Sequence, residues 1–404
     1  MLWRCGQCWK SALRLQQASL DKLYNFADCA GLQLLYSLNA LQRNSDTCWN
    51  SSNALSLLKY SASKKYNMSW ELGNEPNGYS DLGRRGINGS VLAQDHQQLR
   101  NLLQSVRFYS RSALYGPNTG LPRKSHAQLL EGFLKNGGSM VDVVTWQHYY
   151  TGRRVSKVDD FLKTRLLDTL NDQITKVLKI VNTHAPGKRV WLGGFGPAWA
   201  AGTSNLSDTF AASFLWLNTL GMSALHGIDV VLRHSFFDYG FSRMVDQNFT
   251  PLPDYWLSLL FKRLVGQRVL GVQVAGLQRR PRPGRVIRDK LRIYAHCTSP
   301  RSQSYVRGSI TIFIINLHRS RKKIKLAGSL RNRSVQQYLL QPLGAEGLQS
   351  RSVLLNGEPL QMVDDESLPE FRPRTLRPGR TIAMPPTSIG FYVIRNINAY
   401  ACRR

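Results

Sequence analysis

The sequence predicts an α/β fold, a (β/α)8 TIM barrel followed by an antiparallel β-sandwich. Three observations predict it. Between residues 30 and 265, short β-rich apolar runs alternate with longer stretches of helical periodicity, which is typical of a parallel sheet covered by helices. No glycine-rich phosphate fingerprint follows any of these runs, which counts against a dinucleotide-binding sheet. After about residue 268 only short β-rich runs separated by turns remain, as in a sandwich.

Six strand–helix units make up the first part of the chain. The strands are predicted at residues 32–38, 68–72, 112–115, 141–146, 189–192 and 229–233. The helices are predicted at residues 53–61, 93–103, 127–134, 165–181, 208–220 and 255–264. A closed barrel needs eight strands, so we expect the first two strands to be missing from this chain. A barrel without them would expose sheet edges and core, and we expect the chain alone to be unstable.

The C-terminal part is predicted to contain seven short strands, at residues 290–296, 309–316, 323–326, 335–341, 352–355, 381–384 and 388–394. Cys297 and Cys402 fall near the ends of the first and last of these segments. We expect a disulfide between them rather than two free thiols. The predicted organisation is an irregular segment at 1–20 that is not native to the fold, a partial barrel at 21–267 and a sandwich at 268–404.

The charge of the chain limits its partners. Fifty-four Lys and Arg residues against 25 Asp and Glu residues give a net charge of +29 over 404 residues. A charge this large indicates a polyanionic partner, and nucleic acid, anionic lipid and a sulfated glycan all qualify by composition alone. The apolar runs are much shorter than the roughly 20 residues that span a bilayer, so we expect no transmembrane helix.

Six N-x-S/T sequons indicate a secreted glycoprotein. We expect glycosylation at five of them, excluding Asn248, which Pro251 follows closely; the five are Asn50, Asn67, Asn88, Asn205 and Asn332. The N-terminus lacks the apolar region of a signal peptide, so we expect that the natural protein begins earlier. Cys5 and Cys8 form a lone CxxC without a second ligand pair nearby, which does not favour a redox or zinc site. We expect no metal and no cofactor.

The most informative motif is Trp70-Glu71-Leu72-Gly73-Asn74-Glu75-Pro76-Asn77. It follows a predicted strand, and barrel active sites are built at the carboxyl ends of the strands. A glycosidase needs a carboxylic acid beside the leaving-group oxygen, and Glu75 is the candidate, because Glu71 lies within the strand. Asn74 is a candidate hydrogen-bond partner for a sugar hydroxyl. A lone Asn-Glu-Pro tripeptide would be weak evidence for a catalytic acid. The predicted strand before it and the predicted barrel around it strengthen this interpretation.

Longer stretches around this motif resemble the heparanases of glycoside hydrolase family 79. The resemblance extends from about residue 20 to the C-terminus and is carried by residues 50–53, 70–77, 145–150 and 251–260. Residues 161–168 and 281–292 resemble the non-cleaving branch of that family more specifically. The resemblance implies a (β/α)8 barrel with a C-terminal β-sandwich, a heparan sulfate site between basic loops, and a chain that starts earlier with a signal peptide.

Carried over residue by residue, the resemblance assigns Glu75 as the proton donor. It places the nucleophile in a Trp-Leu-Gly-Glu pattern, where this chain has Trp191-Leu192-Gly193-Gly194. Gly194 stands where the glutamate belongs, and no Asp or Glu occurs between Asp172 and Asp208. Retaining hydrolysis needs two carboxylates about 5–5.5 Å apart, and inverting hydrolysis needs them about 6.5–9.5 Å apart. We therefore do not expect glycoside hydrolysis.

Further residues are candidates for substrate binding. His148 and Tyr149 end one predicted strand and Arg233 ends another, where each could contact a sugar, a sulfate or a carboxylate; the alternative is a satisfied side chain at the barrel rim. The basic clusters include Arg123, Lys124, Arg153, Arg154 and residues 279–292. Each cluster alone is typical of a solvated face, whereas together they predict a positive field suited to a sulfated chain.

Three functions follow in order of preference. The first is a secreted, catalytically silent protein of the extracellular matrix or cell surface that binds heparan sulfate or heparin proteoglycans, with an active heparanase as a further candidate partner. The second is an active endo-β-glucuronidase that hydrolyses heparan sulfate, which would need a rescuing carboxylate. The third is a nucleic-acid-binding protein, which charge alone suggests and no zinc-finger, RRM or helix-turn-helix signature supports.

Overall fold

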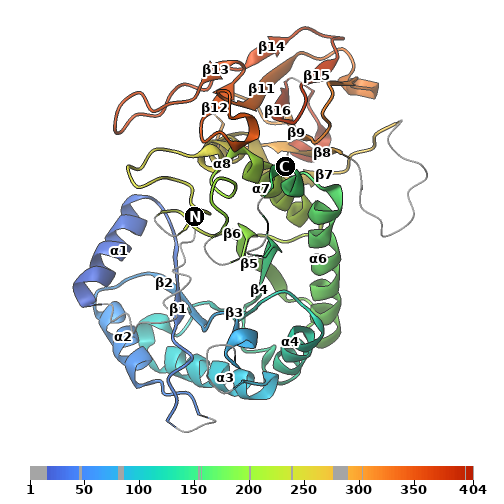
Figure 1. Ribbon diagram of the computed structural model, residues 1–404. Helices are drawn as coiled ribbons and strands as arrows, with labels where there is room; N and C mark the ends of the chain where they lie inside the picture. The colour runs from blue at the N-terminus through green and yellow to red at the C-terminus, as the bar shows by residue number, and fades with distance from the viewer. Residues whose placement is uncertain are drawn as a thin grey trace. The chain divides into compact units, whose positions relative to one another are not determined.

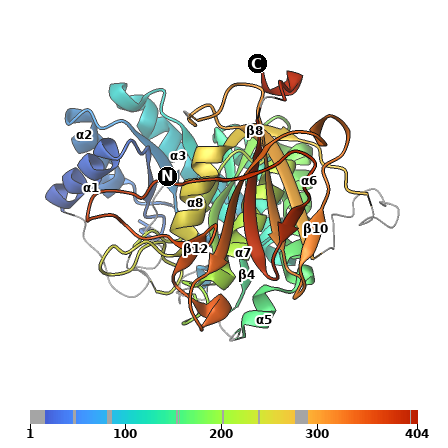
Figure 2. The ribbon, with the colours of Figure 1, turned by 90° about the horizontal axis from the view of Figure 1, so that it is seen from above.

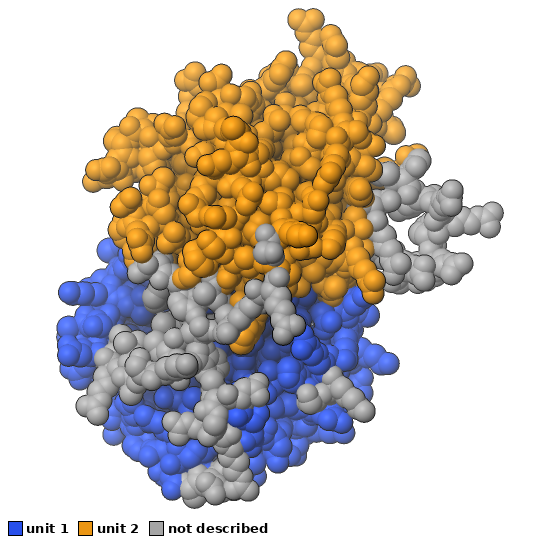
Figure 3. Space-filling view, in the orientation of Figure 1, with its two compact units in different colours: residues 1–149, 172–196, 226–235 blue, residues 150–171, 197–225, 236–404 orange. Residues whose placement is uncertain are grey.

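A computed structural model of the chain describes residues 16–44, 48–80, 86–152, 155, 157–199, 202–237, 240–275, 290–302, 304–395 and 397–403. Within these ranges no helix is both long enough and apolar enough to cross a bilayer. Contacts divide the chain into two compact units, coloured separately in Figure 3. Unit 1 comprises residues 1–149, 172–196 and 226–235, and unit 2 comprises residues 150–171, 197–225 and 236–404.

A curled parallel sheet of six strands forms the centre of unit 1 (Figure 1). Its strands pair in chain order and are β1 (Leu34–Leu38), β2 (Met68–Leu72), β3 (Leu114–Thr119), β4 (Val143–Thr151), β5 (Arg189–Ala198) and β6 (Val231–Arg233). All six predicted strands are confirmed. Because the strands are parallel, their carboxyl ends meet at one edge of the sheet. This edge brings together residues that are far apart in the sequence.

Helices follow the strands as the periodicity predicts. They are α2 (Ser52–Ser63), α3 (Gly89–Ser105), α4 (Lys124–Gly137), α5 (Val158–Phe161), α6 (Thr164–His184), α7 (Phe210–Leu225) and α8 (Pro253–Leu264). A further helix, α1 (Gln17–Cys29), begins inside the segment predicted to be irregular. It buries Leu20 and Ala27, which are seven residues apart on one helical face, but Gln16 at its N-cap makes no side-chain capping bond. The usual signature of a helix start is therefore absent from the sequence.

Unit 2 is built on an antiparallel sheet of eight strands, β7 (Val265–Leu270), β8 (Leu291–Thr298), β9 (Ile310–Asn316), β11 (Val335–Pro342), β12 (Val353–Leu355), β13 (Glu358–Pro359), β14 (Arg374–Leu376) and β16 (Ser388–Ile394). Two further strands, β10 (Lys322–Ile324) and β15 (Ile382–Met384), pair with each other. The seven predicted strands are confirmed. The sequence missed β7, β13 and β14, which are mostly exposed or half-buried and so lack an alternating apolar pattern.

The core of unit 2 lies between these two sheets. Ile293, Ile314, Val335 and Tyr392 of the large sheet pack with Ile382 and Met384 of β15. The other side of the large sheet carries α7 and α8, which contact β9, β16 and β7 (Figure 2). These helices therefore cluster with the antiparallel sheet. The boundaries predicted from the sequence, at residues 20 and 267, stay predictions.

A buried ion pair joins β8 to α6 within unit 2. Arg292 is almost fully buried, and its Nη2 lies 2.7 Å from Asp168 Oδ1 while its Nη1 donates to Asn218 Oδ1 at 3.1 Å. The sequence placed Arg292 in a solvated basic cluster, and this expectation is wrong, because its guanidinium is neutralised inside the unit. Removing one partner of such a pair typically costs 3–5 kcal/mol. Lys290 of that cluster is exposed, and its residues 279–289 lie outside the described residues.

The predicted disulfide is present between Cys297 at the end of β8 and Cys402 near the C-terminus. The two cysteines are 105 residues apart, and closing so long a loop removes much of the entropy of the unfolded chain. Cys402 O also accepts a hydrogen bond from Gly308 N. The C-terminal segment is thus fixed against the start of β9 by both a covalent and a backbone link.

We expect the paired substitution Cys297→Ser and Cys402→Ser to lower the free energy of unfolding of unit 2 by about 2–5 kcal/mol, because the unfolded chain regains loop entropy. Urea unfolding followed by near-ultraviolet circular dichroism measures this change. Cys29→Ser at an exposed free thiol is the control and should leave the midpoint unchanged. An equal midpoint for the paired variant and the control would contradict the prediction.

Candidate functional site

The Asn-Glu-Pro turn directly follows β2 and is fixed by its backbone. Gly73 has a φ of +76°, and a β-carbon there would lie 2.4 Å from Tyr79 Oη, so only glycine fits. Glu75 has a φ of +46°, an uncommon conformation for a residue with a side chain. Its N–H donates to Asn118 O at 3.1 Å, which ties the turn to the end of β3. A 3-10 helix, η1 (Pro76–Gly78), then leads the chain away.

Glu75 itself is half-buried at this edge of the sheet. Its Oε1 lies 3.3 Å from the position that a β-carbon at Gly120 would take, so the carboxyl group lies beside the loop after β3. The same loop is held by Asn77, whose Oδ1 accepts from Gly120 N at 2.6 Å. The structure therefore presents a carboxylic acid on a constrained turn at the carboxyl end of a parallel sheet, where the sequence placed it.

Three amide side chains form a hydrogen-bonded row that links the turn after β2, the end of β3 and the middle of β4. Gln147 Nε2 donates to Asn74 Oδ1 at 2.6 Å, and Asn118 Nδ2 donates to the same oxygen at 3.1 Å. Asn118 Nδ2 also lies 3.3 Å from Glu71 Oε1. Gln147, Asn118 and Glu71 are each at most 2% exposed. Asn74 was predicted as a sugar contact, but its oxygen already accepts two hydrogen bonds from protein amides.

The middle of β5 approaches this row closely because it contains two consecutive glycines, Gly193 and Gly194. A β-carbon on Gly194 would lie 2.8 Å from Gln147 Cδ and 2.9 Å from both Gln147 Cγ and Oε1. A β-carbon on Gly193 would lie 2.7 Å from Asn118 Oδ1. Contacts below 3.0 Å are hard-sphere clashes. The space that a side chain at residue 194 would need is thus filled by Gln147.

Gln147 and Asn118 are the residues of this site that the sequence analysis did not single out. Asn118 lies near the carboxyl end of β3, and this position is the signal that could have identified it. Gln147 directly follows the strand predicted at 141–146, but it lies in the middle of β4. Asn118 also has a φ of +52° in a buried position, a backbone state that asparagine tolerates better than most residues. Sequence alone does not reveal that the side chain of Gln147 would occupy the space above Gly194.

His148 and Tyr149 lie on opposite faces of β4. Tyr149 Oη donates to Gln147 Oε1 at 3.2 Å, so Tyr149 contacts the amide row. His148 is 1% exposed and its ring lies 6.1 Å from that of Trp146, two residues before it on the same strand face. Burial lowers the pKa of His148 to about 3, so its imidazole is neutral at physiological pH. The structure places His148 among buried side chains, away from Gln147.

Five basic residues were predicted to contact a ligand, and the structure describes the side chains of two of them. Arg233 is half-buried at the end of β6, where its Nη1 donates to His234 O at 2.6 Å, and Arg123 is exposed at the N-cap of α4. The side chain of Lys124 and both residues Arg153 and Arg154 lie outside the described residues. Within the described ranges no group of His, Cys, Asp and Glu could hold a metal ion.

The sequon asparagines lie at the surface. Asn67, Asn88, Asn205 and Asn332 are exposed, and Asn50 is half-buried with its Oδ1 accepting from Ser52 N at 3.1 Å. Asn88 caps α3 by accepting from Val91 N through Oδ1, which leaves its side-chain nitrogen available. Glycosylation of these residues stays a prediction.

Comparisons with known proteins agree with this geometry. Residues 10–221 match the model of the glycosyl hydrolase family 79 N-terminal domain. Inactive heparanase-2 from Homo sapiens is 68% identical over 393 residues, which are 97% of this chain and 66% of that relative, so the chain spans just under two thirds of its length. Heparanase from Bos taurus is 46% identical over 386 residues, 96% of this chain and 69% of that relative.

Solved structures of low identity support the fold. An α-L-arabinofuranosidase from Thermotoga maritima superposes with a TM-score of 0.66 at 12% identity, covering 93% of this chain and 78% of that one. At this identity the likeness extends to the fold alone.

We expect Gly194→Ala to lower the free energy of unfolding of unit 1 by about 1–3 kcal/mol, because the new β-carbon overpacks against Gln147. The cost should shrink when Gln147→Ala is present, and a double-mutant cycle by urea unfolding measures that coupling. Gly78→Ala is the matched control, because a β-carbon at Gly78 meets nothing within 4 Å. Additive costs in the cycle would contradict the assigned contact.

We expect acid to destabilise unit 1 partly through His148. Below pH 6.5 the unfolded chain protonates this histidine, whereas the folded chain does so only near pH 3, so stability is lost as the pH falls from about 6.5. His148→Gln should reduce this slope by up to about 1.4 kcal/mol per pH unit. Urea midpoints measured from pH 7 to pH 4.5 check this, and identical slopes for both proteins would count against it.

Proposed function

The chain belongs to glycosyl hydrolase family 79, and we propose that it is a heparanase-like protein that binds heparan sulfate without hydrolysing it. The relative named inactive heparanase-2 supports a non-catalytic role. The observation that carries the proposal is at residue 194, where a retaining glycosidase of this family would present its nucleophilic glutamate. There the chain has a glycine, and the space above it holds the Gln147 amide.

A neutral amide does not replace a nucleophilic carboxylate. Retaining hydrolysis needs an anionic oxygen that attacks the anomeric carbon while a second carboxylic acid protonates the leaving group. Gln147 carries no charge, and its nitrogen and oxygen already bond to Asn74 and Tyr149. Loss of a covalent nucleophile typically lowers the rate by a factor on the order of 10⁴–10⁶. Glu75 would retain its position as proton donor without an attacking group opposite it.

Glu71 is the carboxylate that the amide row contacts, and it is the candidate for a rescuing group in an active endo-β-glucuronidase. Its side chain lies within β2, is 1% exposed, and reaches the row through Asn118 Nδ2. A carboxylate buried beneath the row does not face an entering glycan. Burial therefore favours the non-catalytic proposal over the active enzyme.

The proposed ligand and location follow from charge and sequons. A net charge of +29 suits a polyanion, and arginine forks bind planar oxyanions such as sulfate groups in bidentate fashion. Four of the five predicted sequon asparagines are exposed, as glycosylation in a secretory compartment requires. We therefore propose that the protein is located in the extracellular matrix or at the cell surface and binds heparan sulfate proteoglycans there, with an active heparanase as a further candidate partner.

The proposal predicts binding without turnover. The chain should be retained on heparin at physiological salt and elute with a steep salt dependence, and it should release no product from heparan sulfate over days. A bovine heparanase sample is the positive control for hydrolysis. Glu75→Gln removes one negative charge from a chain of net charge +29 and should therefore leave heparin elution nearly unchanged. Product release that disappears in Glu75→Gln would refute the non-catalytic assignment.

A further inference from the structure

Charge is strongly segregated along unit 2. Residues 290–404 contain nineteen Lys and Arg residues and six Asp and Glu residues, and all six acids fall between Glu346 and Glu370. Residues 290–345 and 371–404 therefore contain no acidic residue. Where the sheet brings these two segments together, cationic side chains should lie side by side without intervening carboxylates.

The strand pairing brings them together at one end of the large sheet. Val335 at the start of β11 pairs with Ile394 at the end of β16 and with Leu376 at the end of β14. The residues just beyond these positions are Arg333 and Ser334, Arg395, and Arg377. Three arginines from the two acid-free segments thus gather where β11 begins and where β14 and β16 end.

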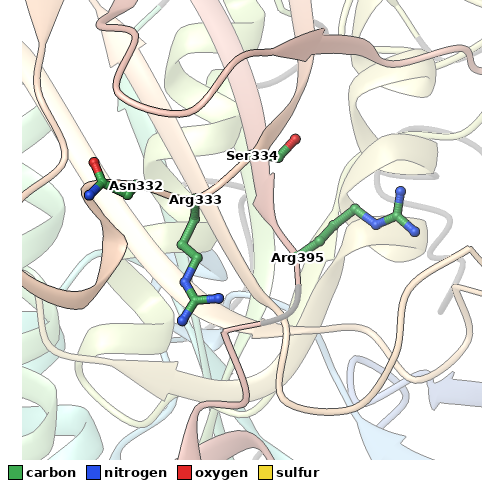
Figure 4. A pocket seen from close by; sticks show the side chains of 4 residues that line it. All are labelled: Asn332, Arg333, Ser334 and Arg395. Atoms are coloured by element: carbon green, nitrogen blue, oxygen red, sulfur yellow. The ribbon is translucent and has the colours of Figure 1, made fainter.

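A pocket of about 310 Å³ opens at this end of the sheet and is lined by Asn332, Arg333, Ser334 and Arg395 (Figure 4). Arg333, Arg377 and Arg395 are exposed. Among the described residues, neither Arg377 nor Arg395 forms an ion pair with a carboxylate. Arg395 is positioned by an aromatic contact, since its guanidinium carbon lies 6.0 Å from the ring centre of Tyr305.

The lining of the pocket indicates an anionic ligand with more than one charge. Figure 4 shows the two guanidinium groups pointing in different directions on either side of Ser334, which suits a ligand with more than one anionic group. An extended chain with regularly spaced sulfate groups could contact each arginine with a separate group. The Ser334 hydroxyl between them is a neutral hydrogen-bonding group suited to a sugar hydroxyl.

We propose that this end of the antiparallel sheet, formed by Arg333, Ser334, Arg377 and Arg395, is a second binding site for a sulfated glycan, separate from the residues around Glu75. The proposal rests on the proposed function for the class of ligand, and it adds a location in unit 2 that uses no residue of the glycosidase-like site. One long glycan chain, or two chains, would then engage the protein at both units.

The test uses the full chain and a fluorescent heparin oligosaccharide, with binding measured between 50 and 400 mM NaCl. Arg333→Gln with Arg395→Gln removes two pocket charges and keeps the Asn-x-Ser sequon. Arg107→Gln with Arg111→Gln removes two exposed charges of unit 1 and is the matched control. The pocket pair should weaken binding several-fold and reduce the slope of log Kd against log salt by about one to two, because fewer counterions are released. The control pair should change neither quantity appreciably.

Three outcomes would overturn the proposal. Equal losses in the pocket and control pairs would indicate a diffuse field, and unchanged binding in the pocket pair would locate the glycan elsewhere. The wild-type chain could bind a DNA duplex with the same salt slope as it binds heparin, and the pocket pair could lose that DNA binding too. This result would indicate a site for polyanions in general. Failure of the wild-type chain to bind heparin at 50 mM NaCl would instead refute the proposed function itself. Thermal melts of both pairs confirm that each variant is folded.

Discussion

The approach of β5 to its neighbours at the carboxyl edge of the parallel sheet determines the site. Gly193 and Gly194 leave no room for a β-carbon beside Asn118 and Gln147, and this closeness lets the two amides join Asn74 in one hydrogen-bonded row. Buried amides are costly unless they are paired, and each member of the row has a partner in it. The site is consequently a network of buried amides, in which Asn118 Oδ1 alone among the row's described oxygens lacks a hydrogen-bond partner, rather than a pair of opposed carboxylates.

The sequence predicted the architecture well because its signals are periodic. All six parallel strands and six helices were placed, since buried strands and amphipathic helices leave a regular apolar pattern. It missed α1, β7 and β14 for the opposite reason: they bury little or begin without a capping residue. Arg292 was misplaced because a run of basic residues does not distinguish a charge in solvent from one paired to Asp168 inside the unit.

The candidate site was predictable only in part. The sequence alone places Glu75 after a predicted strand, and the spacing of the Trp-Leu-Gly motif identifies the glycine at residue 194. The contact between Gln147 and Gly194 depends on the register between β4 and β5 and on the rotamer of Gln147, and the sequence reveals neither. His148 shows the same limit, because one step along a strand decides whether a side chain meets the amide row or the buried face beside Trp146.

The filled space above Gly194 has an evolutionary consequence. A glutamate arising at residue 194 would force its side chain into the volume of Gln147 and would destabilise unit 1. Any side chain at residue 194 would therefore need an accompanying change at residue 147. The contact thus couples the two positions, so that they would have to change as a pair.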